Sequence, residues 1–106
     1  MRKVNRVNKP CYTEYVRHAM RFYSRYLNWT HFKSKVDELN WFACHRAIAD
    51  YSIRDKDILV YVYGEFDTIP DNVYAIANKY HIHQNIIWDM MKDFERKVAV
   101  ERGLWV

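Results

Sequence analysis

At 106 residues the chain has the length of one domain with one hydrophobic core. Half of its residues are hydrophobic and 17% are aromatic, a composition that excludes a disordered segment. With only two Gly and two Pro, the chain lacks the turn residues that a β-sandwich or barrel requires. We therefore predict an all-α fold, a single small helical domain of four or five helices.

The cysteines and the N-terminal residues indicate the cellular compartment of the protein. Cys11 and Cys44 are too few to staple the domain, and no secretory signal accompanies them, so we expect reduced thiols. The basic start Met1-Arg2-Lys3 is not followed by the apolar region of a signal peptide. No run of about 18 apolar residues occurs, so we expect a cytoplasmic protein that does not bind membranes.

Charge is distributed unevenly along the chain, although the formal net charge is only +4. Residues 1–35 hold nine Lys or Arg and a single acid. Residues 36–75 hold three bases and eight acids, and residues 76–106 hold five bases and four acids. A polyanionic partner should therefore meet the N-terminal third first.

Residues 1–10 are basic and show no hydrophobic periodicity, which fits either an extended basic arm or a frayed terminus. A first helix is predicted from Thr13, as N-cap, to about Leu27. Its polar side carries three arginines four residues apart, which form either a phosphate-binding ridge or a solvated helix face. These residues are Arg17, Arg21 and Arg25.

Two more helices are predicted before residue 69. The first runs over about Ser34–Tyr51, with Thr30 as a candidate cap, and Trp41 is expected in the core or at an interface. Its expected apolar face comprises Leu39, Ala43, Ala47 and Ile48. Ser52, followed three residues later by Asp55, resembles a capping box and predicts a helix to about Tyr63. The β-branched and aromatic residues 58–66 would suit a strand, but no second strand is available to pair with it.

Residues 69–103 contain two predicted helices joined by a short turn. Pro70 favours a helix start, and the first of the two is predicted over about Asp71–Tyr80. Its apolar face comprises Val73, Ile76, Ala77 and Tyr80. Residues 81–83 interrupt this periodicity, and the second helix ends before Gly103. Its apolar face comprises Ile87, Met90, Met91, Phe94 and Val98. This arrangement is a helix-turn-helix.

The same segment resembles the helix-turn-helix of many repressors and of region four of bacterial sigma factors. In that family an apolar-Ala pair is followed, after three residues, by Gly, an apolar residue and Ser or Thr. Ile76-Ala77 and His81-Ile82-His83 match this spacing, with His81 in the place of the Gly. Upstream, residues 52–59 look like the helix start that precedes the unit in sigma region four and in phage late-transcription activators of the RinA and ArpU type.

The resemblance implies a C-terminal helix-turn-helix over residues 70–103 that binds double-stranded DNA as a transcription regulator of phage or mobile-element origin. It places six residues where bases and phosphates would be contacted. They are His83, Gln84, Asn85, Trp88, Asp89 and Lys92. The arginines of the first helix would contact phosphates, and a homodimer is compatible with this interpretation.

A protein-binding module on the same scaffold is the alternative, for instance a phage inhibitor of a host enzyme or defence complex, or a partner of RNA polymerase. Asp89, an acid on the face that would approach DNA, favours this alternative. Trp88 is expected on the side of its helix away from Met91. There it would stack on a partner protein, contact thymine methyl groups, or pack against the first helix.

Neither catalysis nor metal binding is indicated by the sequence. The His81-x-His83 pair has no second pair at helical spacing, and Cys44 and His45 point in different directions on a helix, so no structural zinc site is expected. A Gly-rich phosphate loop is excluded by the two glycines, and no Ser-His-Asp signature is present. We therefore expect no enzymatic activity and no cofactor.

Overall fold

The computed structural model describes residues 11–28 and 31–104, which form five α-helices and no strand. The helices are α1 Thr13–Arg25, α2 Lys35–Ile48, α3 Ile53–Gly64, α4 Ile69–Tyr80 and α5 Gln84–Glu101. The predicted all-α class is confirmed. The basic arm over residues 1–10 and the cap at Thr30 lie outside the described residues.

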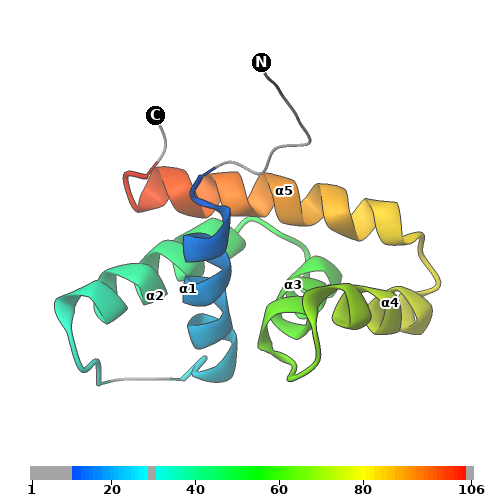
Figure 1. Cartoon of the computed structure of the whole chain (residues 1–106), viewed down its shortest axis with the longest axis horizontal. Helices are drawn as coiled ribbons and strands as arrows, with labels where there is room; N and C mark the ends of the chain where they lie inside the picture. Colours follow the sequence, from blue (N-terminus) through cyan, green and yellow to red (C-terminus); the bar gives the residue numbers. More distant parts are fainter. Residues whose placement is uncertain (1–10, 29–30, 105–106) are drawn as a thin grey trace, which may run out of the picture.

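The long helix α5 lies across one side of the other four helices (Figure 1). α1 contacts α2, α3 and α5, and α4 contacts both α3 and α5. In Figure 1 the N-terminal ends of α2 and α5 lie at opposite ends of the molecule. The start of α2 and the first turns of α5 are therefore far apart in the molecule.

Three helices begin at a capping hydroxyl. Ser34, Ser52 and Thr68 each accept a hydrogen bond from the backbone N–H of an Asp three residues later. Such a cap satisfies an N–H group that the helix itself leaves unpaired, and the Asp adds a favourable charge at the positive helix end. The helix start predicted at Ser52 is confirmed, with Ser52 as the N-cap residue. α4 begins two residues earlier than predicted because Thr68 provides the cap.

The first two helices end earlier than predicted, and α1 begins without a side-chain cap. Tyr12 is its N-cap residue and makes no side-chain cap bond, while Thr13 is buried as the first helical residue. α1 ends at Arg25 because Tyr26 leaves the helical region, at φ −133°. α2 ends at Ile48, after which residues 49–50 form a turn.

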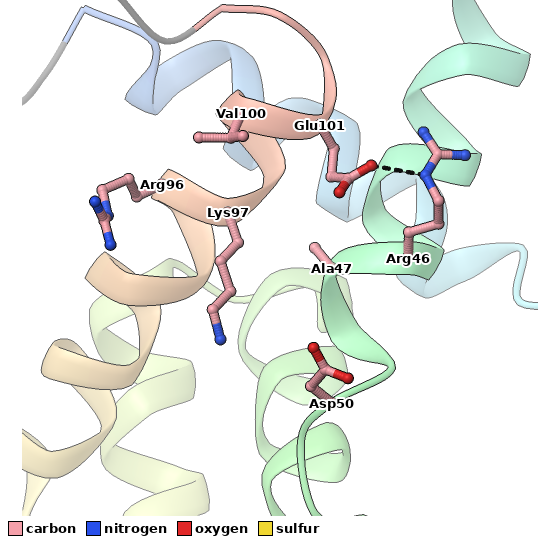
Figure 2. A pocket seen from close by; sticks show the side chains of 7 residues that line it. All are labelled: Arg46, Ala47, Asp50, Arg96, Lys97, Val100 and Glu101. Carbon is pink, nitrogen blue, oxygen red and sulfur yellow. Dashed lines mark hydrogen bonds and ion pairs between the residues drawn. The ribbon is translucent and has the colours of Figure 1, made fainter.

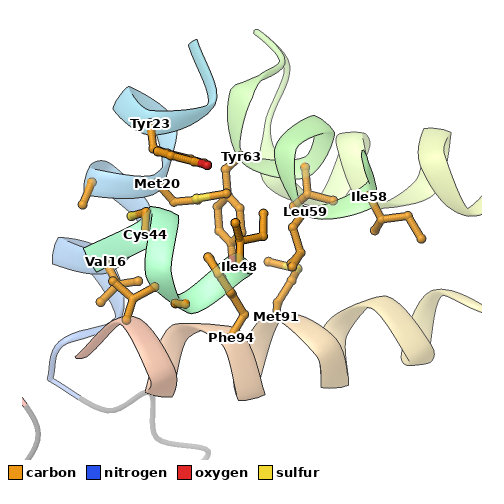
Figure 3. Close-up of a cluster of buried hydrophobic side chains, with 14 of the residues drawn as sticks. Val16, Met20, Tyr23, Cys44, Ile48, Ile58, Leu59, Tyr63, Met91 and Phe94 are labelled. Atoms are coloured by element: carbon orange, nitrogen blue, oxygen red, sulfur yellow. The ribbon is translucent and has the colours of Figure 1, made fainter. Parts of the chain in front are cut away.

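α3 is a helix despite its β-branched composition. Ile58, Leu59, Val62 and Tyr63 recur at three- and four-residue spacing, and all are buried against neighbouring helices. This tertiary burial outweighs the local preference for a strand. Figure 3 shows Tyr63 and Leu59 among core side chains from α1, α2 and α5. Each fully buried large apolar side chain contributes about 1.5–3 kcal/mol relative to an exposed one.

α1 and α3 approach most closely at Ser24 and Gly64. A Cβ atom at Gly64 would lie 2.8 Å from the Cβ atom of Ser24, closer than carbon atoms pack. The turn after α3 is held by Asn72, which is buried and donates to the carbonyl oxygen of Val62 at 3.0 Å. The connection between α3 and α4 is therefore held by a buried amide.

Candidate nucleic-acid interface

A three-residue connection, His81-Ile82-His83, joins α4 to α5. His81 adopts the left-handed conformation at φ 56°, the only non-Gly residue with positive φ in the described chain. The backbone N–H of Ile82 donates to the carbonyl of Ala77 at 3.1 Å, and the Ile82 side chain packs against the core. His81 in the place of the Gly was open to two interpretations, a strained positive φ or a turn of different geometry, and the structure has the positive φ. The connection therefore holds α4 and α5 in one relative orientation.

His83 caps α5. Its Nδ1 atom accepts a hydrogen bond from the backbone N–H of Asn85 at 3.1 Å, so this ring nitrogen is occupied within the chain. The proposed contact of His83 with DNA is therefore limited to the remainder of its ring. Gln84 and Asn85 follow directly, and both side chains are exposed.

The outward face of α5 is polar. Asn85, Asp89, Lys92 and Arg96 recur at spacings of four, three and four residues, which places them on one side of the helix, and all four are exposed. In Figure 1 α2, α3 and α4 lie below α5, and the start of α1 overlaps it. The acid at position 89 is not paired with Lys92, and no described ion pair or hydrogen bond holds either side chain. We refer to these four residues as the outward face of α5.

Trp88 does not stand outward as expected. Its side chain is half-buried and packs against the hydrophobic core. The reason is helical geometry, because a residue three positions before the buried Met91 lies only about 60° from it around the helix axis. The indole is therefore largely a supporting residue for α5 rather than an exposed contact.

The predicted arginine ridge is divided by the fold. The Nε atom of Arg17 lies 2.9 Å from a carboxylate oxygen of Glu95, which is only 5% exposed. The Tyr63 hydroxyl donates to the same oxygen at 2.6 Å. Arg17 is therefore used inside the molecule to balance a buried carboxylate, whereas Arg21 and Arg25 are exposed.

Arg25 lies at the end of α1 that is farther from α5 (Figure 1). Its Nε atom donates to the carbonyl oxygen of Gly64 at 3.0 Å, and its guanidinium lies 4.1 Å from the ring centre of Phe66. Arg21 is exposed one turn before it. Neither arginine continues the outward face of α5, so a single DNA surface that includes both sites is not formed by the described residues.

A second cluster, formed by Tyr51, Asp93 and Lys97, joins α5 to the segment between α2 and α3. The Tyr51 hydroxyl donates to Asp93 at 2.7 Å, and Lys97 lies 3.3 Å from the same carboxylate. The hydrogen bond from Tyr51, with help from Lys97, lowers the pKa of Asp93 below its usual value. Burial raises the pKa of Tyr51 above its usual value, and the hydrogen bond to Asp93 is the second-largest cause. Lys97 is thus committed to Asp93 and does not balance Asp89.

The sequence did not predict that the carboxylates of Glu95 and Asp93 hold other helices or segments to α5. Glu95 lies four residues after Met91 and three before Val98, at the edge of the predicted apolar face, and an acid in that position was the available signal for a buried charge. Its partner, 78 residues earlier in the chain, could not be chosen among the three arginines of the first helix without the packing of α1 on α5.

Burial raises the pKa of Tyr63 well above its usual value, and the neighbouring carboxylate of Glu95 adds to the effect.

A hollow of about 290 Å³ lies between α2 and α5 (Figure 2). Its lining consists of Arg46, Ala47, Asp50, Arg96, Lys97, Val100 and Glu101. The Nε atom of Arg46 lies 2.7 Å from the Glu101 carboxylate across this hollow. Charges of both signs line it, so it does not select an anionic ligand.

No group of three or more His, Cys, Asp or Glu that could hold a metal ion occurs among residues 11–28 and 31–104. Cys44 is fully buried, and burial raises the pKa of its thiol to about 12, which keeps it protonated and unreactive at neutral pH. None of the helices in the described part of the chain combines the length and hydrophobicity that a membrane crossing requires.

No protein-family model matches the chain, and comparisons with curated proteins and with solved structures give no match either. The resemblance of residues 52–103 to sigma region four therefore rests on their residue pattern alone.

Proposed function

We propose that the protein is a DNA-binding transcription regulator in which α4, residues 81–83 and α5 form a helix-turn-helix. In such a motif the second helix enters the major groove and reads base edges with its first turns. The observation that carries the proposal is the three-residue connection, with His81 in the left-handed conformation and Ile82 packed inward. A phage or mobile-element origin belongs to the same proposal and rests on the residue pattern.

The first turns of α5 carry the groups that read bases. Gln84 and Asn85 are exposed amides, and in a bidentate pair the amide NH₂ donates to N7 of adenine while the amide oxygen accepts from the adenine amino group. Each such pair is worth about 1–3 kcal/mol of discrimination between bases. Lys92, two turns further on, is placed to contact a phosphate.

The outward face supplies only modest electrostatic attraction. Lys92 and Arg96 are its two bases, and Asp89 opposes them. Two phosphate contacts would give a slope of about −1.8 in log K against log salt concentration. The proposal therefore predicts a shallow salt dependence from α5, because Arg17 is held by Glu95 inside the fold.

The test combines one affinity and one specificity measurement on duplex DNA. A binding site is selected from random duplex, and binding is followed by fluorescence anisotropy across a salt series. Asn85→Ala should relax the preference for the selected site without changing the salt slope. Lys92→Gln should make the slope shallower by about 1.

Lys33→Gln is the matched control, since Lys33 is exposed before α2 and the change removes the same charge. It should leave both readouts unchanged if α5 is the contact surface. Absence of duplex binding by the wild-type chain at low salt, or unchanged site preference in Asn85→Ala, would contradict the proposal.

A protein-binding function is the second candidate, and the observation that favours it is Asp89. This carboxylate lies exposed on the outward face of α5, and no described hydrogen bond or ion pair holds it. A carboxylate in that position repels phosphate but attracts a basic protein surface, such as one on RNA polymerase or on a defence complex.

A further inference from the structure

The hydrogen bond that caps α5 decides which ring nitrogen of His83 carries a proton. The backbone nitrogen of Asn85 lies 3.1 Å from the Nδ1 atom of His83. A backbone N–H can only donate, so Nδ1 has to present a lone pair to it. A neutral imidazole has one protonated and one unprotonated nitrogen, and the proton of this ring is therefore on Nε2.

The Nε2 atom of His83 is the nitrogen left for a partner outside the chain. The side chain is exposed, and no hydrogen bond reaches Nε2 within residues 11–28 and 31–104. The two nitrogens of an imidazole point in diverging directions. Because Nδ1 is turned to the first turn of α5, the Nε2–H group points away from that turn. The ring thus offers a ligand one donor and no acceptor.

Histidine at this position is not explained by helix capping alone. The other three side-chain caps of the described helices are the hydroxyls of Ser34, Ser52 and Thr68. Ser, Thr, Asp and Asn are the residues that best satisfy a free N–H group at a helix start, and each would do so without an outward donor. A residue that departs from the local structural preference is most often kept for function. The outward Nε2–H of His83 is the property that a serine would lack.

We propose that His83 is a specificity-determining residue that donates from Nε2–H to a hydrogen-bond acceptor of duplex DNA, while its Nδ1 atom holds the first turn of α5 in place. This role rests on the proposed function, because it requires α5 to enter the major groove. Guanine presents two acceptors there, N7 and O6, whereas cytosine presents an amino donor. A donor-only ring therefore favours guanine and rejects cytosine at the base that it contacts. A phosphate oxygen has the same acceptor chemistry.

Two substitutions separate the cap from the outward donor. His83→Ser keeps an acceptor for the N–H of Asn85 and removes Nε2–H, so its melting temperature should match that of the wild type. His83→Ala removes both and should melt at a lower temperature. His31→Ser is the matched control for DNA binding, since His31 is exposed beside the start of α2, at the end of the molecule opposite the first turns of α5 (Figure 1).

The protonation of the ring can be measured without DNA. Nitrogen-15 chemical shifts distinguish a protonated from an unprotonated imidazole nitrogen, and at about pH 8 imidazoles are ordinarily neutral. His83 should show a single tautomer with its proton on Nε2. The ring of His81 makes no hydrogen bond among the described residues, so it should average between both tautomers and serves as the internal reference. A proton on Nδ1 of His83, or the same averaging as in His81, would overturn the proposal whether or not the chain binds DNA.

Duplex binding then measures the contact itself, by anisotropy on sites that the wild-type chain selects from random duplex. His83→Ser should bind about fivefold more weakly, the loss expected for one neutral hydrogen bond, while His31→Ser binds as the wild type does. The salt slope of His83→Ser should equal that of the wild type, because a neutral ring releases no counterion. A slope shallower by about 0.9 would mean that the ring contacts phosphate as a cation, and the proposal would be wrong.

The sequence dependence of the loss identifies the acceptor. Loss confined to sites with guanine at one position, with cytosine newly accepted there, places Nε2–H on a base edge. An equal loss for all sequences places it on a phosphate oxygen. Equal affinity of His83→Ser and the wild type would overturn the role of His83 and leave the proposed function standing. Absence of duplex binding by the wild type would contradict the proposed function, and the contact of His83 with it.

Discussion

Arg17 and Glu95 form a nearly buried ion pair that joins the first helix to the last. The guanidinium Nε atom lies 2.9 Å from the carboxylate, and the two side chains are 17% and 6% exposed. Tyr63 from α3 completes the site with a hydroxyl that donates to the same carboxylate oxygen. Three helices that are far apart in the sequence are thereby fixed to one buried charge.

Removing the arginine of this pair should destabilise the fold strongly. Arg17→Gln leaves the Glu95 carboxylate buried without its cation, which costs about 3–5 kcal/mol in the free energy of unfolding. Arg21→Gln, a matched change at an exposed position one turn later on α1, should alter stability by no more than about 0.5 kcal/mol. Urea denaturation of both variants measures the difference. Equal effects of the two substitutions would show that the pair contributes nothing.

The left-handed conformation of His81 predicts a stabilising substitution. A non-Gly residue at φ 56° is strained, and Gly adopts this conformation without a clash between its side chain and the backbone. His81→Gly should raise the free energy of unfolding by about 1 kcal/mol. His81→Val, which places a β-branched residue there, should lower it. A lower melting temperature for His81→Gly than for the wild type would show that the imidazole makes a contact worth more than the strain.

The contact between α1 and α3 predicts two opposite effects at neighbouring positions. Ser24 Oγ is buried and has no hydrogen-bond partner among the described residues, so Ser24→Ala removes an unsatisfied polar group and should stabilise the fold by about 1 kcal/mol. Gly64→Ala should destabilise it, because the new Cβ atom would lie 2.8 Å from the Ser24 Cβ atom. Thermal unfolding of both variants tests the packing. Loss of stability in Ser24→Ala would indicate a partner for the hydroxyl.

Helix positions could be predicted from the sequence because the signals are local. The caps at Ser34, Ser52 and Thr68 act within three residues, and the sequence predicts the helix start at Ser52. The spacing after the apolar-Ala pair places His81 where the family pattern has Gly, but it does not decide between a positive φ and a different turn geometry; the structure has the positive φ. The sequence predicts a helix rather than a strand for residues 58–64 because no second strand is available to pair with it. The structure confirms the helix as α3.

The candidate site was less predictable because it depends on contacts between distant helices. The spacing of Arg17, Arg21 and Arg25 is regular, but only the packing of α1 on α5 shows that one of them faces a buried carboxylate. Trp88 was misplaced for a different reason, since its angle to Met91 could have been worked out from helical geometry. The exposure of Leu39 reflects how α2 sits on α1 and α5, which periodicity alone does not give.

The buried thiol of Cys44 predicts a loss of stability at alkaline pH. Burial raises its pKa to about 12, whereas the thiol of the unfolded chain ionises near its ordinary value of 9.0. The folded state therefore keeps a proton that the unfolded state loses. The contribution is complete below about pH 9 and declines as the pH rises toward 12, by at most about 1.4 kcal/mol per pH unit.

Urea denaturation between pH 8 and about pH 10.5 measures this decline. Cys44→Ala should show a shallower fall than the wild type, although it loses stability at neutral pH through the cavity it leaves. Cys11→Ala, at an exposed thiol, should follow the wild-type curve. Parallel curves for Cys44→Ala and the wild type would show that other groups, such as the buried Tyr63, carry the whole alkaline effect.

Asp89 separates the two candidate functions with a single substitution. The carboxylate lies on the outward face of α5, and neither Lys92 nor Lys97 pairs with it, since Lys97 is held by Asp93. Asp89→Asn removes its charge without changing the size of the side chain. If α5 approaches DNA, the variant should bind random-sequence duplex more tightly than the wild type, because a repulsion from phosphate is removed.

A basic protein partner would respond in the opposite sense, since the carboxylate would then be an attractive contact and its loss would weaken or slow binding. Glu14→Gln is the matched control for net charge, because Glu14 is exposed at the start of α1 and carries the same charge. Anisotropy with random duplex at low and moderate salt measures the effect. Tighter binding of Asp89→Asn, and not of Glu14→Gln, would place DNA at this face. Duplex affinity that is equal for all three chains means that DNA does not contact α5, and the regulator proposal would then be wrong.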